Sequence, residues 1–342
     1  MKARLVLACA LLSVLALAGE TGDQWWGHAP GPQRPQSSTP QSSTRTTPGL
    51  PAVARPTPHA VRPAAAAPSA PACDDRNPRD TLRPLSPMPS PGHMPPGSTM
   101  AAIAQRGALV VGILEDTFPL AFRNERLQPQ GFEIDIARDI AGAILGDPAR
   151  VVFRPVREAD RFTSETAGSM DLVIAAATIT CERRKLVDFS AVYYEAQQRL
   201  LVNRGSGVEN LADLKDQRVC APLGSTSMQK ILSAPTRPTA VGAAIATDCL
   251  MMLQLGEVDA VSTDDTLLAG MQAQDSRTEI VGPPLNQEPY GIAINKNTPD
   301  LVRFVNGVLE RRARDGRWQA SYRNWLKALN PPPVPPTPQY RD

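Results

Sequence analysis

The stretch AGSMDLVIAAAT, residues 167–178, decides the fold because its pattern recurs in LGEVDAVSTDDT, residues 255–266. In both stretches a helical pattern stops at a glycine, and an aspartate then precedes an apolar strand with a polar end. Gly168 and Gly256 suit the left-handed position that ends many helices. The same pattern is also a common helix-to-strand turn, so the recurrence alone does not require a repeat. Together with the alternation around it, the recurrence favours two α/β lobes of similar topology.

Strand-like and helix-like segments alternate between about residue 100 and residue 330. ALVVGIL (108–114) and VVFRPV (151–156) are typical of strands, and the segment between them has apolar side chains at helical spacing. These side chains are Ile134, Ala137, Ile140, Ala141 and Ile144. Further strands are expected at 218–224 and 259–263, and further helices from residue 225 and over 246–256. The pattern predicts α/β layers, in which a mixed, mainly parallel sheet is flanked by helices.

The composition excludes several kinds of partner and chemistry. Thirty-six basic and 34 acidic side chains give a formal charge of +2, and no basic block is interleaved with aromatic residues. We therefore expect no nucleic-acid partner. No cofactor is expected either. The folded body lacks histidine, which excludes histidine-based catalysis and histidine metal sites from it. The three histidines all precede it, at His28, His59 and His93.

The first residues, MKARLVLACALLSVLALAGE, are typical of an export signal. Lys2 and Arg4 precede an apolar run at 5–17, which is short for a membrane span. We predict a signal peptide over residues 1–19 and a location on the outer face of the cytoplasmic membrane or in the cell envelope; an uncleaved anchor is the alternative. Glu20 stands where the lipidated cysteine of a lipobox would be, so lipid anchoring stays open.

Two proline-rich segments flank the folded body. About half of the 35 prolines lie between residues 30 and 96, mixed with Ser, Thr and Ala. Such a segment cannot bury a core, so residues 20–99 are predicted to be a disordered arm. Residues 330–342 form a second proline-rich tail.

Four cysteines remain after removal of the signal peptide: Cys73, Cys181, Cys220 and Cys249. An even number in an oxidising compartment suggests two disulfides, and four cysteines allow three pairings.

The polar ends of the two recurring strands predict where a ligand binds. In open parallel sheets, ligands bind beyond the carboxyl ends of the strands. Those ends are residues 176–178 in one lobe and 263–265 in the other, and two ends that face each other make a cleft. Asp264 offers a carboxylate to a cation there, beside the Ala176 carbonyl and the Thr178 hydroxyl. Asp264 could instead cap the following helix.

Anion-binding groups lie next to the same strand ends. Arg183 has a planar guanidinium that can grip a carboxylate with two hydrogen bonds. Ser225 or Thr226 begins a helix, whose free N–H groups also attract an anion. One cation site beside a two-sided anion site fits the head of a free α-amino acid. The alternative for Arg183 is a surface salt bridge with Glu182 or Asp188.

Six motifs in order resemble a known family. They are GFEIDIARDIA (131–141), ATITCERRKLVDFSAVYY (177–194), LADLKDQRVCAPLGSTS (211–227), VDAVSTDD (258–265), EPYGIAI (288–294) and LVRFVNGVLERRARDGRWQASYRNWL (301–326). Over about residues 105–328 the chain resembles the polar amino-acid binding proteins of ABC importers, solute-binding protein family 3. It is most similar to actinobacterial glutamine/glutamate-binding lipoproteins, which share Cys-Glu-Arg-Arg and the proline-rich extensions.

The resemblance implies a two-lobed periplasmic-binding fold of type II, with a hinge and an interlobe cleft. We expect lobe 1 at residues 100–198, lobe 2 at 199–288 and a return to lobe 1 at 289–329. The crossovers would lie near 197–201 and 288–291. The protein would be a monomer that closes on a free amino acid and then docks on a membrane permease.

The resemblance also implies roles for individual residues. Arg183 would bind the α-carboxylate, shared with Ser225 and Thr226. Thr178 and the Ala176 carbonyl would contact the amino-acid head.

Three further positions complete the implied site. Asp264 would bind the ammonium group. Arg161 matches an arginine that reaches the ligand side chain in binders of acidic amino acids; its alternative role is that of a solvated helix residue. The family walls its ligand with aromatic side chains, and Phe118 or Phe122 could serve here.

The expected ligand is glutamate or aspartate, with glutamine or asparagine tolerated. Pro222 stands where glutamine-specific members have a lysine. The physical reason for the acidic preference is that Arg161 adds a third positive group without a matching third acid.

The hinge implied by the resemblance bears on the disulfides, because a bridge between lobes would block closure. Cys220 and Cys249 both belong to the second lobe, so we expect them to pair, which leaves Cys181 to pair with Cys73. That second bridge would staple the arm to the first lobe beside Arg183.

Two other functions are open. A binding protein of this kind could act as an amino-acid sensor for a membrane partner. Some proteins of this fold are enzymes, such as dehydratases, which need a cleft acid or base. Glu158 is the nearest candidate, and no catalytic role is expected for it.

Overall fold

The structure is a computed structural model that describes residues 77–163, 168–329 and 334–342. The predicted signal peptide, most of the predicted arm and Cys73 lie outside the described residues. Within those ranges the structure contains no helix long and apolar enough to cross a membrane.

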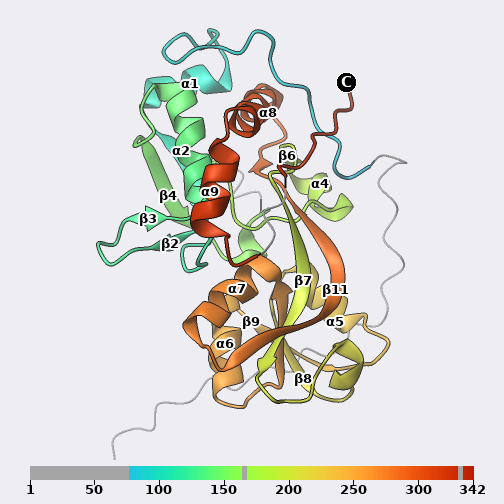
Figure 1. The fold of residues 1–342 in the computed structure, drawn as a ribbon. Helices are drawn as coiled ribbons and strands as arrows, with labels where there is room; N and C mark the ends of the chain where they lie inside the picture. Colours follow the sequence, from blue (N-terminus) through green and yellow to red (C-terminus); the bar gives the residue numbers. More distant parts are fainter. Residues whose placement is uncertain (1–76, 164–167, 330–333) are drawn as a thin grey trace, which may run out of the picture. The chain divides into compact units, whose positions relative to one another are not determined.

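The first lobe is built on a five-stranded sheet with the order β4-β1-β5-β12-β6 (Figure 1). Its strands are β1 (Leu109–Ile113), β4 (Val151–Pro155), β5 (Leu172–Val173), β6 (Asp188–Phe189) and β12 (Ala293–Ile294). β1 is parallel to β4 and β5, whereas β12 is antiparallel to both of its neighbours. The chain therefore returns to the first lobe after passing through the second, as the resemblance implies.

Helices and short turns flank this sheet. They are α1 (Thr99–Arg106), α2 (Phe132–Leu145), η1 (Glu158–Asp160), α4 (Cys181–Leu186), α8 (Pro299–Arg314) and α9 (Arg317–Trp325), with a small hairpin of β2 (Phe122–Arg123) and β3 (Pro129–Gln130). The predicted apolar stripe of α2 is fully buried at each of its five positions. The 3.6-residue spacing thus identified both the helix and the face that packs on the core.

The second lobe has a five-stranded sheet with the order β11-β7-β10-β8-β9. Its elements are β7 (Tyr194–Asn203), η2 (Leu211–Leu214), β8 (Arg218–Pro222), α5 (Thr226–Leu232), β9 (Thr239–Ala243), α6 (Ala246–Gln254), β10 (Ala260–Asp264), α7 (Asp265–Gln274) and β11 (Thr278–Tyr290). β8 is parallel to β9 and β10, and β7 is antiparallel to β10 and β11. Both predicted α/β layers with mixed sheets are confirmed.

Two long strands connect the lobes. β7 and β11 pair along their whole length, with a register shift between Val281 and Asn286 (Figure 1). β7 joins β10 only from Gln198 onward. The crossovers therefore lie at 194–197 on β7 and at 286–290 on β11, a few residues earlier than predicted.

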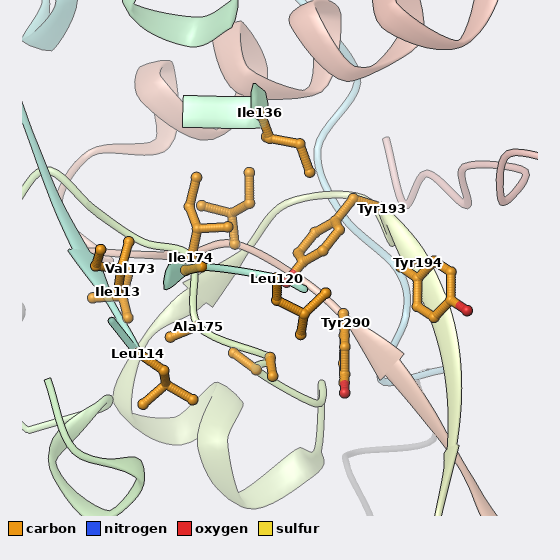
Figure 2. Close-up of a cluster of buried hydrophobic side chains, with 14 of the residues drawn as sticks. Ile113, Leu114, Leu120, Ile136, Val173, Ile174, Ala175, Tyr193, Tyr194 and Tyr290 are labelled. Carbon is orange, nitrogen blue, oxygen red and sulfur yellow. The ribbon is translucent and has the colours of Figure 1, made fainter. Parts of the chain in front are cut away.

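A continuous apolar core lies under the first sheet and extends along the interlobe strands. Figure 2 shows part of it, including Ile113, Ile136 and Ile174. Tyr193 and Tyr290 also belong to it, with ring centroids 6.0 Å apart (Figure 2). This packing holds the ends of both interlobe strands against the first lobe.

The two recurring stretches differ at their glycines. Gly256 has a φ of +68°, which confirms the predicted helix stop. Gly168 was predicted to have the same conformation, and this is wrong: it has no positive φ and lies in a helical turn. Both copies share the contact that their aspartates make: the carboxylates of Asp171 and Asp259 each accept a 2.8 Å hydrogen bond, from the N–H groups of Val110 and Arg218.

The described parts of the predicted arm and tail are ordered and contact each other. The Thr81 hydroxyl donates a 2.7 Å hydrogen bond to the Phe189 carbonyl, and Thr81 also forms a β-bridge with Tyr340. The Tyr340 hydroxyl donates to Glu310 on α8. Residues 77–98 of the predicted arm thus include contacts with the first lobe, which backbone and hydroxyl pairing supplies in place of apolar side chains.

One predicted disulfide is confirmed: Cys220 on β8 and Cys249 on α6 are joined within the second lobe. Cys181 is also disulfide-bonded. Its predicted partner, Cys73, lies outside the described residues, so that pairing stays a prediction.

Candidate functional site

A cavity lies where the strand ends of the two lobes meet. Its empty space, with the solvent at its opening included, is about 280 Å³. Six of the predicted ligand-binding residues line it: Arg161, Ala176, Thr178, Ser225, Thr226 and Asp264. Side chains that were not predicted as ligand contacts complete the wall, among them Leu114, Glu158, Thr263 and Leu267. The predicted cleft between residues 176–178 and 263–265 therefore exists as a shared cavity.

Asp264, at the end of β10, has one anchored and one unpaired carboxylate oxygen. Its Oδ2 accepts a 2.6 Å hydrogen bond from the Tyr290 hydroxyl, whereas its buried Oδ1 has no partner. The side chain does not cap α7. The neighbouring Asp265 accepts instead from the N–H groups of Thr266 and Gln197. The capping alternative is thus excluded, and Asp264 presents a bare oxygen in a cavity wall.

Burial disfavours the charge on that carboxylate. Desolvation raises the pKa of Asp264 well above its ordinary value, and the nearby charge of Glu288 raises it further. The Tyr290 hydrogen bond and Arg161 act in the opposite direction. A cation placed against Oδ1 would relieve the desolvation penalty, because an opposite charge at short range favours the ionised form.

Arg161 is buried, with 3% of its surface exposed, so it is not a solvated helix residue. Its Nε donates to the Glu158 carbonyl at 3.0 Å. Its Nη1 donates to the carbonyls of Ala175 and Ala176 at 2.7 and 2.8 Å. The Arg161 guanidinium therefore links residues 175–176, which follow β5, to the turn that carries Glu158.

The backbone of Ala176, just after β5, is also held by Glu133. Ala176 has a φ of +45°, which is uncommon for a residue with a side chain. Its N–H donates to the buried Glu133 carboxylate at 2.7 Å. These contacts keep the backbone of residues 175–176 turned at the cavity wall.

Arg183 lies beside the cavity but is not part of its lining. Its Nη1 donates to the Thr178 carbonyl at 2.7 Å, and its Nη2 reaches across to the Gly224 carbonyl of the second lobe at 3.2 Å. Its guanidinium carbon lies 4.7 Å from the centroid of the Phe162 ring. Desolvation, reinforced by the charge of Arg161, lowers the pKa of Arg183 to about 9. The salt-bridge alternative is not observed, since Glu182 pairs with Lys185.

The hydroxyls at the start of α5 already have protein partners. The Ser225 hydroxyl donates to the Pro222 carbonyl at 2.6 Å and accepts from the N–H of Met228. The Thr226 hydroxyl donates to the Glu288 carboxylate at 2.8 Å. Glu288 lies on β11, so this bond ties the helix start to an interlobe strand.

Known proteins share this architecture. Residues 109–328 match the family of bacterial extracellular solute-binding proteins, family 3. The chain belongs to this family. The ABC transporter glutamine-binding protein GlnH of Bacillus subtilis is 36% identical over 231 residues, which cover 67% of this chain and 85% of the relative. The glutamate/aspartate import solute-binding protein of Salmonella typhimurium is 28% identical over 252 residues, which cover 70% and 82%.

A solved structure of the same kind is also similar. An ancestral arginine-binding protein bound to glutamine is 36% identical, with a TM-score of 0.60, and the match covers 65% of this chain and 98% of that one. The two-lobed fold expected from the sequence is therefore that of a family 3 solute-binding protein.

The aromatic wall expected in this solute-binding protein is not part of the cavity. Phe118 is 38% exposed and packs edge-to-face against Phe122, with ring centroids 5.0 Å apart. Leu114, the residue after β1, lies at the cavity instead, together with Leu267 of α7. The loop after β1 turns the phenylalanine rings outward, so an aliphatic wall replaces the predicted aromatic one.

Glu158, named from the sequence as the nearest candidate for a cleft acid, was not predicted as a ligand contact of this solute-binding protein. It lies in η1 with 4% of its surface exposed, and its Oε2 is buried without a partner. Desolvation raises the pKa of Glu158, opposed chiefly by the charge of Arg161. Its spacing of three residues from Arg161 is a sequence signal that could have linked it to the ligand. Among the described residues, no group of acidic, histidine or cysteine side chains could hold a metal ion.

Proposed function

We propose that this solute-binding protein binds a free polar amino acid between its lobes and delivers it to the membrane permease of an ABC importer. The observation that carries the proposal is the unpaired, buried Oδ1 of Asp264 in the interlobe cavity. Relatives named for binding glutamine or for importing glutamate and aspartate support this ligand class.

The ammonium group of the ligand would occupy the position beside Asp264 Oδ1. A buried carboxylate without a partner is costly, and a protonated amine is the complementary group. The Thr178 hydroxyl lies at the same cavity and offers an oxygen to the amine. The Ala176 carbonyl, which the resemblance assigned to this contact, already accepts from Arg161.

The α-carboxylate would be bound by Arg183 together with Ser225 and Thr226. Arg183 has five N–H donors in a fixed fork and uses its two terminal nitrogens on backbone carbonyls. We expect its bond to Gly224 to be exchanged for a bond to the ligand. Desolvation of Arg183 supports this role, because a buried guanidinium gains from an anionic partner.

Binding would be coupled to rotation of the lobes about β7 and β11. The lobes are in close contact around the cavity: an added Cβ on Gly224 would lie 2.7 Å from the Cα of Ala159. The Thr247 hydroxyl also donates across the boundary to Asp116 at 2.7 Å. Opening must break these contacts, and a bridging ligand would favour the closed arrangement.

The side chain of the ligand would reach Arg161, which supports a polar amino acid of the glutamate, aspartate, glutamine or asparagine group. The reason given above for preferring the acids was the absence of a matching third acid. That reason is wrong, because Glu158 lies in the cavity beside Arg161.

Delivery to a permease is the function that the family relationship supports best, and the same binding chemistry would serve a sensor for a membrane partner. Uptake of labelled glutamine and glutamate by a strain that lacks the protein distinguishes the two. Reduced uptake supports transport, and unchanged uptake supports sensing. We propose that the protein is exported as a monomer to the outer face of the cytoplasmic membrane, with no catalytic residue.

A thermal-shift titration of the purified protein against the twenty amino acids tests the binding proposal. Ligand binding to the native state alone raises the melting temperature by mass action. We expect shifts with polar amino acids and none with the large apolar ones. No shift with any of the twenty would refute the proposal.

A further inference from the structure

Two polar groups of the cavity have no role in holding the amino-acid head. One is the buried Glu158 Oε2, which has no hydrogen-bond partner. The other is Nη2 of Arg161, for which the described residues supply no acceptor, whereas Nε and Nη1 are bound to carbonyls. Both groups lie in the cavity wall of the first lobe.

The two groups are fixed relative to each other. The 3.0 Å bond from Arg161 Nε to the Glu158 carbonyl closes the turn at η1 and sets both side chains on the same turn. Two further bonds from Arg161 tie that turn to the strand end at residues 175–176. Neither side chain has room to turn out to solvent, because 4% of Glu158 and 3% of Arg161 are exposed.

Glu158 thus offers a carboxylate acceptor and Arg161 a guanidinium donor to the same cavity. A carboxamide has the complementary pair, since its oxygen accepts and its NH₂ group donates. A carboxylate side chain only accepts and would meet the like charge of Glu158, while an ammonium side chain would meet the charge of Arg161. An aliphatic side chain would leave the buried Glu158 Oε2 unpaired and offer no acceptor to Arg161, which costs more than a missing favourable contact.

We infer that Glu158, together with Arg161, determines specificity by selecting an amino acid with a carboxamide side chain, glutamine or asparagine, over glutamate and aspartate. The inference rests on the proposed function, because it assumes that the head of the amino acid is held at Asp264. Glu158 accepts from the NH₂ group of the ligand, and Arg161 donates to its carbonyl oxygen. The contact of Gly224 with Ala159, next to Glu158, places this subsite at the lobe boundary, where closure excludes water.

Isothermal titration calorimetry of the purified protein with glutamine, asparagine, glutamate and aspartate tests the inference. At neutral pH we expect the wild-type protein to bind glutamine at least about tenfold more tightly than glutamate, which corresponds to one net hydrogen bond and one avoided repulsion. Glu158→Gln supplies an NH₂ donor in place of the carboxylate. It should therefore weaken glutamine binding, strengthen glutamate binding and reverse the preference.

Glu182→Gln is the matched control, because Glu182 is exposed, pairs with Lys185 and lies outside the cavity lining. It should leave the ratio of the two affinities unchanged. Circular dichroism confirms that each variant is folded, and the wild-type ratio tests the inference even if Glu158→Gln does not fold.

The outcomes separate the inference from the proposed function. Wild-type protein that binds glutamate as tightly as glutamine, or a folded Glu158→Gln variant with an unchanged ratio, overturns the inference while amino-acid binding stands. If the protein binds only amino acids other than glutamine, asparagine, glutamate and aspartate, the inference is overturned as well. If none of the twenty amino acids binds, the proposed function itself fails.

Discussion

The two strand ends that meet at the cavity supply different things. At the first end, the carbonyls of Ala175, Ala176 and Thr178 all accept hydrogen bonds from Arg161 or Arg183. At the second end, Asp264 keeps a buried oxygen with no partner. The carbonyls at the first strand end thus form a hydrogen-bonded frame with the two arginines. At the second strand end, the buried Asp264 oxygen lacks a cationic partner. Recurring sequence patterns thus produced similar strands with different chemistry at their ends.

The largest effect on ligand affinity is expected when the charge of the Asp264 carboxylate is removed. Asp264→Asn should weaken binding of the preferred amino acid by about 2–5 kcal/mol, because it leaves the ligand ammonium buried without a counter-charge. Calorimetry measures the change. Asp259→Asn is the control: Asp259 directly precedes β10, is paired with the exposed Arg218 and should leave the affinity unchanged. Equal affinities of wild type and Asp264→Asn would place the ammonium elsewhere.

The disulfide of the second lobe is expected to stabilise the fold without shaping the cavity. Cys220→Ser with Cys249→Ser should lower the free energy of unfolding by roughly 2–4 kcal/mol. The bridge joins β8 to α6 inside the second lobe, so the affinity of the folded variant for its amino acid should stay unchanged. Denaturant titration gives the stability, and calorimetry gives the affinity. A large loss of affinity at constant stability would mean that the bridge shapes the cavity.

Arg183→Lys tests whether Arg183 binds the ligand as well as the Thr178 carbonyl. Lysine keeps the charge but cannot serve two carbonyls and a carboxylate with a planar fork. We expect affinity to fall by about 1.5–3 kcal/mol, the range for a hydrogen bond to a charged group. Lys185→Arg, on the exposed side of the same helix, serves as the control. An unchanged affinity for Arg183→Lys would show that Arg183 only supports the backbone.

The smallest expected effect is a release of protons from Asp264 when the ligand binds. Burial raises the pKa of Asp264 in the free protein, and a bound ammonium group would lower it again. Binding should therefore release protons, and affinity should rise with pH through the pKa of the free protein. Calorimetry in buffers with different heats of ionisation measures the release. Because the pKa of Glu158 is raised as well, Glu158→Gln separates the two contributions. Proton uptake on binding would contradict the assignment of Asp264.

The sequence predicted regular features well, since they depend on local patterns. The apolar spacing of 131–145 gave α2, and the polar strand ends gave Ala176, Thr178 and Asp264 of the cavity lining. A helix start gave Ser225 and Thr226, whereas Arg161 came from the family resemblance. Glu158 was not predicted as a ligand contact, because its burial depends on the approach of Gly224 from the other lobe. The contacts of residues 77–98 could not be predicted for a similar reason: Thr81 is held by Phe189 and Tyr340, which are far away in the sequence.

The most direct test is a crystal structure of the protein with its preferred amino acid. We predict one ligand in the interlobe cavity, with its ammonium nitrogen within about 2.7–3.2 Å of Asp264 Oδ1. Its side chain should point to Arg161. A ligand bound outside this cavity, or one whose carboxylate faces Asp264, would contradict this prediction.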